Sequence, residues 1–70
     1  MPLYMAENGQ DVVISRITGT DTMKTHLNNL GFVVGETIHI VNKIDGNIIV
    51  KVKGVSVAIS QELSKRIHFN

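Results

Sequence analysis

The segment LNNLGFVVGE, residues 27–36, decides the fold because it contains the clearest helix end in the chain. Upstream, apolar residues recur at i, i+4 and i+7 along one face of a helix: Met23, Leu27 and Leu30. Thr20 or Asp21 can cap the start of this helix. Gly31 suits the left-handed position just past its end, and Phe32 can then contact the helix one turn back. The segment therefore joins one helix to a remainder of different periodicity.

The residues after this segment have the periodicity of strands. A strand is predicted over residues 36–43, and Asp45-Gly46 between two apolar runs is a strong hairpin signal. The next strand alternates, with an apolar face made of Ile48, Val50 and Val52. Gly54 permits a second tight turn, and residues 55–59 continue as a fourth strand. We therefore expect three consecutive antiparallel strands here.

Three further elements complete the prediction. Residues 12–17 form the first strand, in which an irregular apolar spacing predicts a bulge or a strong bend. Residues 60–66 form a short helix, and residues 67–69 a last strand. Leu3 and Met5 are expected to cover one end of the core. The fold class is mainly β: five short strands with two helical insertions, which indicate one barrel domain over residues 1–70.

Composition limits the possible functions. Ile and Val together number eighteen against four Leu, which favours strands. The formal charge is only +1 and three aromatic residues are scattered along the chain, so nucleic acid binding is not expected. The chain contains no cysteine and no apolar run long enough for a membrane span, and the start lacks a signal pattern. We expect a cytoplasmic protein without direct membrane insertion.

No group of residues predicts catalysis or metal binding. A catalytic serine needs a base and a third, orienting group, which the spacing does not indicate. His39 and His68 are expected to face solvent, and His26 lies beside the apolar face of the first helix. The carboxylates sit singly at turns, caps and solvated faces. We therefore expect no enzyme activity, no cofactor and no metal site.

The apolar face of the first helix has two interpretations. Its residues either pack onto the open end of the barrel, or leave part of their surface, with Phe32 or Val33, exposed for docking. The residues alone thus indicate a small β-barrel that binds another molecule.

The order of short motifs is more specific than any one of them. The first strand ends in Ile-x-Gly, the helix closes in Leu-x-x-Leu-Gly-Phe-x-x-Gly, and x-Ile-x-Ile-Val, a glycine hairpin, Val-x-Val-x-Gly, Val-Ala-Ile-Ser-x-Glu-Leu and Ile-x-Phe follow. The residues that carry these motifs span nearly the whole chain: Leu3, Gly9, Ile17, Gly19, Leu27, Leu30, Gly31, Phe32, Gly35, Ile38, Ile40, Val41, Gly46, Val50, Val52, Gly54, Ala58, Ile59, Ser60, Glu62 and Ile67. The pattern closely resembles the FeoA family, although many members carry Pro where this chain has Val34.

The resemblance implies an SH3-like barrel and a small cytoplasmic accessory protein of bacterial ferrous iron uptake. Its implied partner is the cytosolic G-protein domain of the membrane permease FeoB, which would place it at the inner membrane through that partner. It does not imply that this chain binds iron. The same barrel occurs as the carboxy-terminal domain of iron-dependent repressors, so a free-standing regulatory or peptide-binding domain is the alternative. The expected partner-binding residues are Lys24, Leu27, Asn28, Leu30, Phe32 and Val33.

Overall fold

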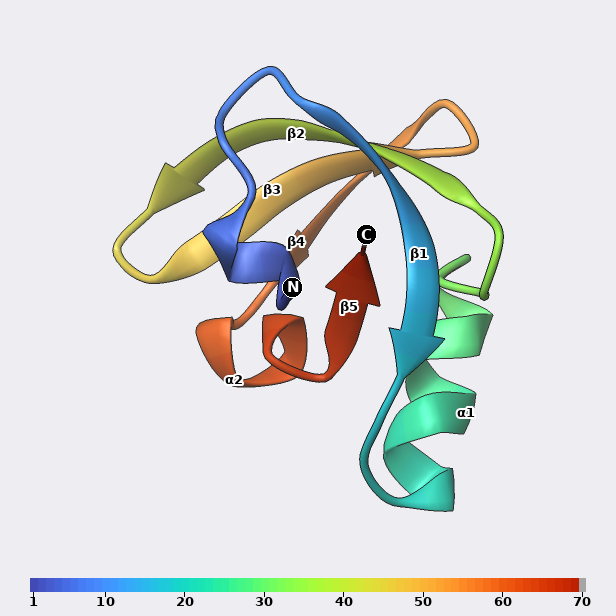
Figure 1. Ribbon diagram of the computed structural model, residues 1–70. Coiled ribbons are helices and arrows are strands. Elements are labelled where there is room, and N and C mark those ends of the chain that lie inside the picture. The colour runs from blue at the N-terminus through green and yellow to red at the C-terminus, as the bar shows by residue number, and fades with distance from the viewer. Residues whose placement is uncertain (70) are drawn as a thin grey trace.

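Five antiparallel strands and two α-helices make up the computed structural model, which describes residues 1–69 (Figure 1). The elements in chain order are η1 (Leu3–Met5), β1 (Asp11–Ile17), α1 (Asp21–Asn29), β2 (Thr37–Ile44), β3 (Asn47–Val52), β4 (Val55–Ile59), α2 (Gln61–Ser64) and β5 (Ile67–Phe69). The strand order across the sheet is β4-β3-β2-β1-β5. The predicted strands and helices are therefore confirmed, whereas the short 3-10 helix η1 is an addition.

The sheet curls into a barrel because β1 pairs with a different strand at each end. Its first residues, Asp11 to Val13, pair with β2, and Ile14 to Ile17 pair with β5. The register shifts between Ile14 and Arg16, which confirms the predicted bulge. A second shift occurs between Ile40 and Asn42 of β2, where the strand faces β3. Bulges increase local twist, which lets so few strands bend around one core.

Two tight turns connect β2, β3 and β4. Asp45 and Gly46 have φ values of 50° and 81°, and Lys53 and Gly54 have 52° and 78°. Positive φ at both loop residues is the geometry of a type I′ turn, whose twist matches that of antiparallel strands. The two hairpins set the register that buries Ile48, Val50 and Val52, as their alternation predicts.

Helix α1 ends as its glycine predicts. Thr20 caps the start, with its hydroxyl oxygen accepting from the N–H of Met23 at 3.2 Å. At the other end Gly31 has a φ of 103°, and its N–H donates to the carbonyl oxygen of Asn28 at 3.0 Å. The next N–H, that of Phe32, donates to the carbonyl oxygen of Leu27. This pair of bonds is a Schellman motif, which turns the chain back toward the barrel.

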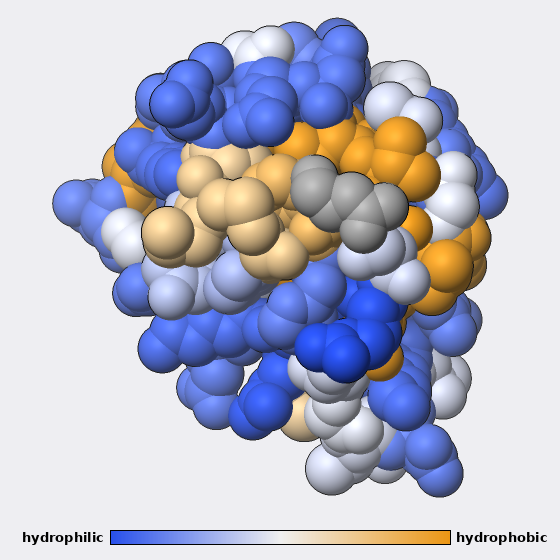
Figure 2. Space-filling view, in the orientation of Figure 1, coloured by the Kyte–Doolittle hydropathy of each residue, from blue (hydrophilic) through white to orange (hydrophobic). Residues whose placement is uncertain are grey.

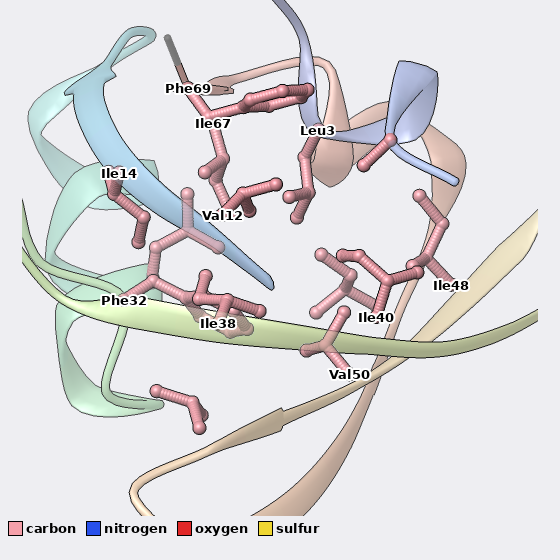
Figure 3. Packing of buried hydrophobic residues seen from close by; sticks show 14 residues of the cluster. Leu3, Val12, Ile14, Phe32, Ile38, Ile40, Ile48, Val50, Ile67 and Phe69 are labelled. Atoms are coloured by element: carbon pink, nitrogen blue, oxygen red, sulfur yellow. The ribbon is translucent and has the colours of Figure 1, made fainter. Parts of the chain in front are cut away.

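Apolar side chains from the strands, η1 and the end of α1 form the core (Figure 3). Its buried residues are Leu3, Ala6, Val12, Ile14, Leu27, Phe32, Ile38, Ile40, Ile48, Val50, Val52, Ile59, Ile67 and Phe69. The prediction that Met5 helps to cover the core is wrong, because its side chain is exposed. Residues three apart lie on one side of a 3-10 turn, so η1 buries Leu3 and Ala6 and turns Met5 outward.

The two outer strands of the sheet differ in what covers them. The free side of β5 is closed by the start of the chain: the N–H of Phe69 donates to the carbonyl oxygen of Met1 at 2.8 Å, and the amino terminus donates to the carbonyl oxygen of Phe69 at 2.7 Å. Pro2 adds an isolated bridge to His68. Strand β4 pairs with β3 alone within residues 1–69. The barrel is thus open along β4.

Candidate interaction surface

Two of the six predicted partner-binding residues are part of the core. Leu27 and Phe32 have no exposed surface, because the Schellman motif directs both side chains under the end of α1. In this conformation they can support a docking surface from beneath but cannot touch a partner. This agrees with the interpretation in which the apolar face of the helix packs onto the barrel, at least for its central residue.

The other four predicted residues reach solvent. Asn28 and Val33 are exposed, whereas Lys24 and Leu30 are partly buried. Leu30 also packs against the edge of the core, so only part of its side chain is available. These four polar and apolar side chains therefore form a solvent-accessible strip along α1 and the segment that follows it.

Val34 and Val13, which are not among the six expected residues, extend this strip. Val34 is 63% exposed and follows Val33 directly. Val13 is exposed on β1, opposite Thr37. The available signal was the position of Val34 between Val33 and Gly35, in the loop that follows the helix. We call the set Val13, Lys24, Asn28, Leu30, Val33 and Val34 the α1–β2 surface.

Backbone hydrogen bonds fix the position of the segment that carries the two valines. The N–H of Gly35 donates to the carbonyl oxygen of Ile14 at 2.8 Å, and the N–H of Ile14 donates to the carbonyl oxygen of Glu36 at 3.0 Å. The N–H of Glu36 donates back to the carbonyl oxygen of Val33 at 3.0 Å, closing a turn around Val34. The segment is therefore attached to β1 next to Val13, and its exposed valines are held by the fold.

Figure 2 shows how apolar residues reach the surface. On the face it presents, apolar atoms gather around the amino-terminal segment and continue at the right-hand edge, on the side where Figure 1 places the connection from α1 to β2. Met1 and Met5 contribute exposed apolar surface at the chain start, and Val33 and Val34 after α1. Exposed apolar residues that gather in this way are typical of protein contact surfaces.

Two polar side-chain pairs lie at the surface of the barrel. Lys53 Nζ lies 3.6 Å from Glu36 Oε1, at the end of the turn that carries Val34. On the outer face of the sheet, His39 Nδ1 lies 2.6 Å from Asp11 Oδ1, which confirms that His39 faces solvent. Exposed pairs of this kind contribute about 0–1 kcal/mol, so they orient side chains more than they stabilise the fold.

The prediction that His68 faces solvent is wrong, because the first residues of the chain lie beside it. It is partly buried beside Pro2, instead of facing solvent on β5. Burial, together with the positive charges of Arg16 and the amino terminus, lowers the pKa of His68 below its usual 6.5. The neutral imidazole is therefore the form that the folded protein favours.

The described part of the chain offers little for small-molecule chemistry. Residues 1–69 contain no detected pocket and no cluster of three or more His, Cys, Asp or Glu side chains placed to hold a metal ion. Neither helix within these residues has the length and apolar character needed to cross a bilayer.

The chain is similar to several solved structures. An iron uptake regulatory protein, FeoA, is 29% identical, with a TM-score of 0.91, over 99% of this chain and 92% of that chain. The zinc complex of FeoA from Stenotrophomonas maltophilia, described as a prokaryotic SH3-domain protein, is 24% identical with a TM-score of 0.85, over 100% of this chain and 89% of that one. The predicted SH3-like barrel is thereby confirmed. No curated protein sequence matches the chain.

The likeness to metal-dependent repressors concerns the fold alone. A manganese-dependent transcriptional repressor is 16% identical with a TM-score of 0.87, over 96% of this chain but 39% of that one. In contrast, the family model of the FeoA domain matches residues 1–69. The chain therefore belongs to the FeoA domain family.

Proposed function

We propose that this chain is a cytoplasmic accessory protein of bacterial ferrous iron uptake, and that it binds the cytosolic G-protein domain of a FeoB-type permease through the α1–β2 surface. Membership of the FeoA family supports the link to iron transport. A role as a ferrous iron transport activating factor has been suggested for the relative from Stenotrophomonas maltophilia. Such a role requires contact with the transport machinery, and through it the protein would be peripheral to the inner membrane.

The observation that carries the choice of surface is the exposure of two adjacent valines in a fixed turn. Val33 and Val34 are 37% and 63% exposed, while backbone bonds to Ile14 hold the turn in place. A preorganised apolar anchor costs little conformational entropy on binding. The flanking polar groups of Lys24 and Asn28 supply the solvated rim that protein interfaces usually have.

A barrel that binds proline-rich peptides is less well supported. That mode requires a groove lined with aromatic side chains. Phe32 and Phe69 are buried in the core, and Tyr4 is partly buried against it. The aromatic residues of this chain thus pack in or against the core. This favours a partner that contacts the turn carrying Val33 and Val34.

Isothermal titration calorimetry with the isolated G domain of the permease from the same organism tests this proposal. The wild-type protein is titrated with and without guanine nucleotide, beside the double variant Val33→Ser/Val34→Ser. We expect saturable binding by the wild type and an affinity that is at least about tenfold weaker for the variant, because burying an exposed valine side chain contributes about 1.5 kcal/mol or more and a loss of about 1.4 kcal/mol is tenfold in affinity.

Ile44→Ser is the matched control for that experiment. Ile44 is also an exposed apolar residue, 48% accessible, but it lies at the opposite end of β2, beside the Asp45-Gly46 turn. We expect its affinity for the G domain to equal that of the wild type. Equal loss in both variants would contradict the α1–β2 surface, and no binding by the wild type would contradict the proposed partner.

A further inference from the structure

The free edge of β4 lacks the features that usually protect an edge strand. Its sequence, VSVAI over residues 55–59, contains no charged residue and no proline, and its pairing with β3 runs without a register shift. Lysines, prolines and bulges are the common means by which proteins prevent pairing along an open edge. The opposite edge, on β5, is closed by Met1 and Pro2. The fold therefore covers one edge and leaves the other available.

The hairpin register identifies which backbone groups are free. The two-residue turn Lys53-Gly54 makes Val52 and Val55 a hydrogen-bonded pair, and such pairs alternate along an antiparallel ladder. Val57 and Ile59 therefore also direct their N–H and C=O groups to β3. Ser56 and Ala58 direct theirs away from it, and in residues 1–69 they form no backbone bond outside the strand ladder.

We propose that this edge pairs with the same edge of a second copy of the chain, in antiparallel orientation about Val57. This register places Ser56 opposite Ala58 of the second copy and satisfies both free residues on each strand, for four hydrogen bonds in all. Other antiparallel registers leave some of these groups unpaired. A two-fold axis makes the interface self-complementary, as in most protein homodimers.

The side chains of β4 and the charges at its two ends fit pairing with a second copy of the chain. Val57 faces Val57 across the axis, and Val55, which is 60% exposed, takes the position opposite Ile59, whose own side chain is already buried in the core. Apolar cross-strand pairs of this kind stabilise a sheet. Lys53 precedes β4 and Glu62 follows it, so antiparallel pairing brings Lys53, which lies 3.6 Å from Glu36 of its own chain, toward Glu62 of the other chain. The proposal does not depend on the proposed function, because it uses a different part of the surface.

The interface is short, so association is weak and depends on concentration. Two five-residue strands bury much less than the about 1,000 Å² of a stable interface. Sedimentation velocity and amide NMR spectra are therefore recorded on the wild type from dilute solution to about 1 mM. We expect the sedimentation coefficient to rise with concentration, and the amide signals of residues 55–59 to shift and exchange more slowly with solvent.

A pair of charged variants tests the register. Ser56→Lys/Ala58→Lys places lysine opposite lysine, and Ser56→Glu/Ala58→Glu places glutamate opposite glutamate, so each alone should associate more weakly than the wild type. Mixed in equal amounts they place lysine opposite glutamate, and we expect association at least about tenfold tighter than that of either variant alone. Thr37→Lys/Val41→Lys adds the same charge to exposed positions of β2, which lies between β1 and β3, and should associate like the wild type.

The proposal would be overturned by a wild type that stays monomeric up to about 1 mM, by edge variants that associate like the wild type, or by a mixture of the two variants that does not associate. Pairing of the edge with an added extended peptide, in a chain that does not pair with itself, would also overturn the choice of a second copy. The spectrum of each variant alone shows whether it is folded.

Discussion

The N–H of Phe32 donates to the carbonyl oxygen of Leu27 at 3.0 Å, and the side chains of both residues are fully buried. This contact fixes the end of α1 to the barrel. Leu27→Ala is expected to lower the free energy of unfolding by about 2–5 kcal/mol, the usual cost of a cavity left by a core leucine. Urea unfolding followed by circular dichroism measures this loss.

Asn28→Ala is the matched control on the same helix, because Asn28 is exposed. Its expected change is within about 0.5 kcal/mol. If Leu27→Ala unfolded at the same urea concentration as the wild type, the burial of this residue under the helix end would be contradicted, and its use as an exposed anchor would regain support.

Lys53→Asn is expected to stabilise the protein by about 1 kcal/mol. Lys53 occupies the first position of a type I′ turn with a φ of 52°, a conformation that costs most residues about 1–2 kcal/mol but suits Asn. The change also removes the pair with Glu36, which is exposed on the lysine side and contributes less. The urea midpoint should rise.

Lys51→Asn separates the turn effect from a general effect of losing a lysine. Lys51 is exposed within β3, where Asn is a poorer strand residue than Lys, so no stabilisation is expected. A lower midpoint for Lys53→Asn than for the wild type would show that the ion pair contributes more than the turn conformation costs.

The stability of the protein should decrease as the pH falls below about 6.5. The folded state lowers the pKa of His68 beneath its usual 6.5 through burial, Arg16 and the amino terminus. Between the two pKa values the unfolded chain binds more protons than the folded one, so acid favours unfolding. Above the unfolded pKa His68 causes no loss of stability. The free energy of unfolding then falls as the pH drops from the unfolded pKa to the folded pKa of His68.

His68→Gln should show a smaller loss of stability than the wild type between pH 7.5 and pH 5. His26→Gln, which changes an exposed histidine on α1, serves as the control. Urea midpoints measured across this pH range decide the question. A wild-type slope retained in His68→Gln would assign the acid sensitivity to other groups.

Local sequence signals predicted most of the fold. Gly31, Asp45-Gly46 and Gly54 mark positions where the backbone needs positive φ, and each turn formed there. The alternation of Ile48, Val50 and Val52 predicted which face is buried. Met5 could not be placed in the same way, because its orientation depends on η1, whose three residues carry too little periodicity to indicate a 3-10 turn.

The candidate surface was harder to predict from the sequence. The spacing of Met23, Leu27 and Leu30 gives one apolar face but not the depth to which each residue is buried. That depth depends on the Schellman motif, which places Leu27 in the core of the barrel and leaves Leu30 partly buried at the edge of the core. Val34 is exposed because of tertiary hydrogen bonds to β1, which no local pattern reveals.

The most direct test of the proposed function is an amide NMR titration of the labelled protein with the cytosolic G domain of the permease. We predict saturable shifts that cluster on the α1–β2 surface, with residues 33–35 among the largest and the Asp45-Gly46 turn unchanged. A spectrum that stays the same at high concentrations of the G domain, with and without nucleotide, would contradict direct binding to that domain.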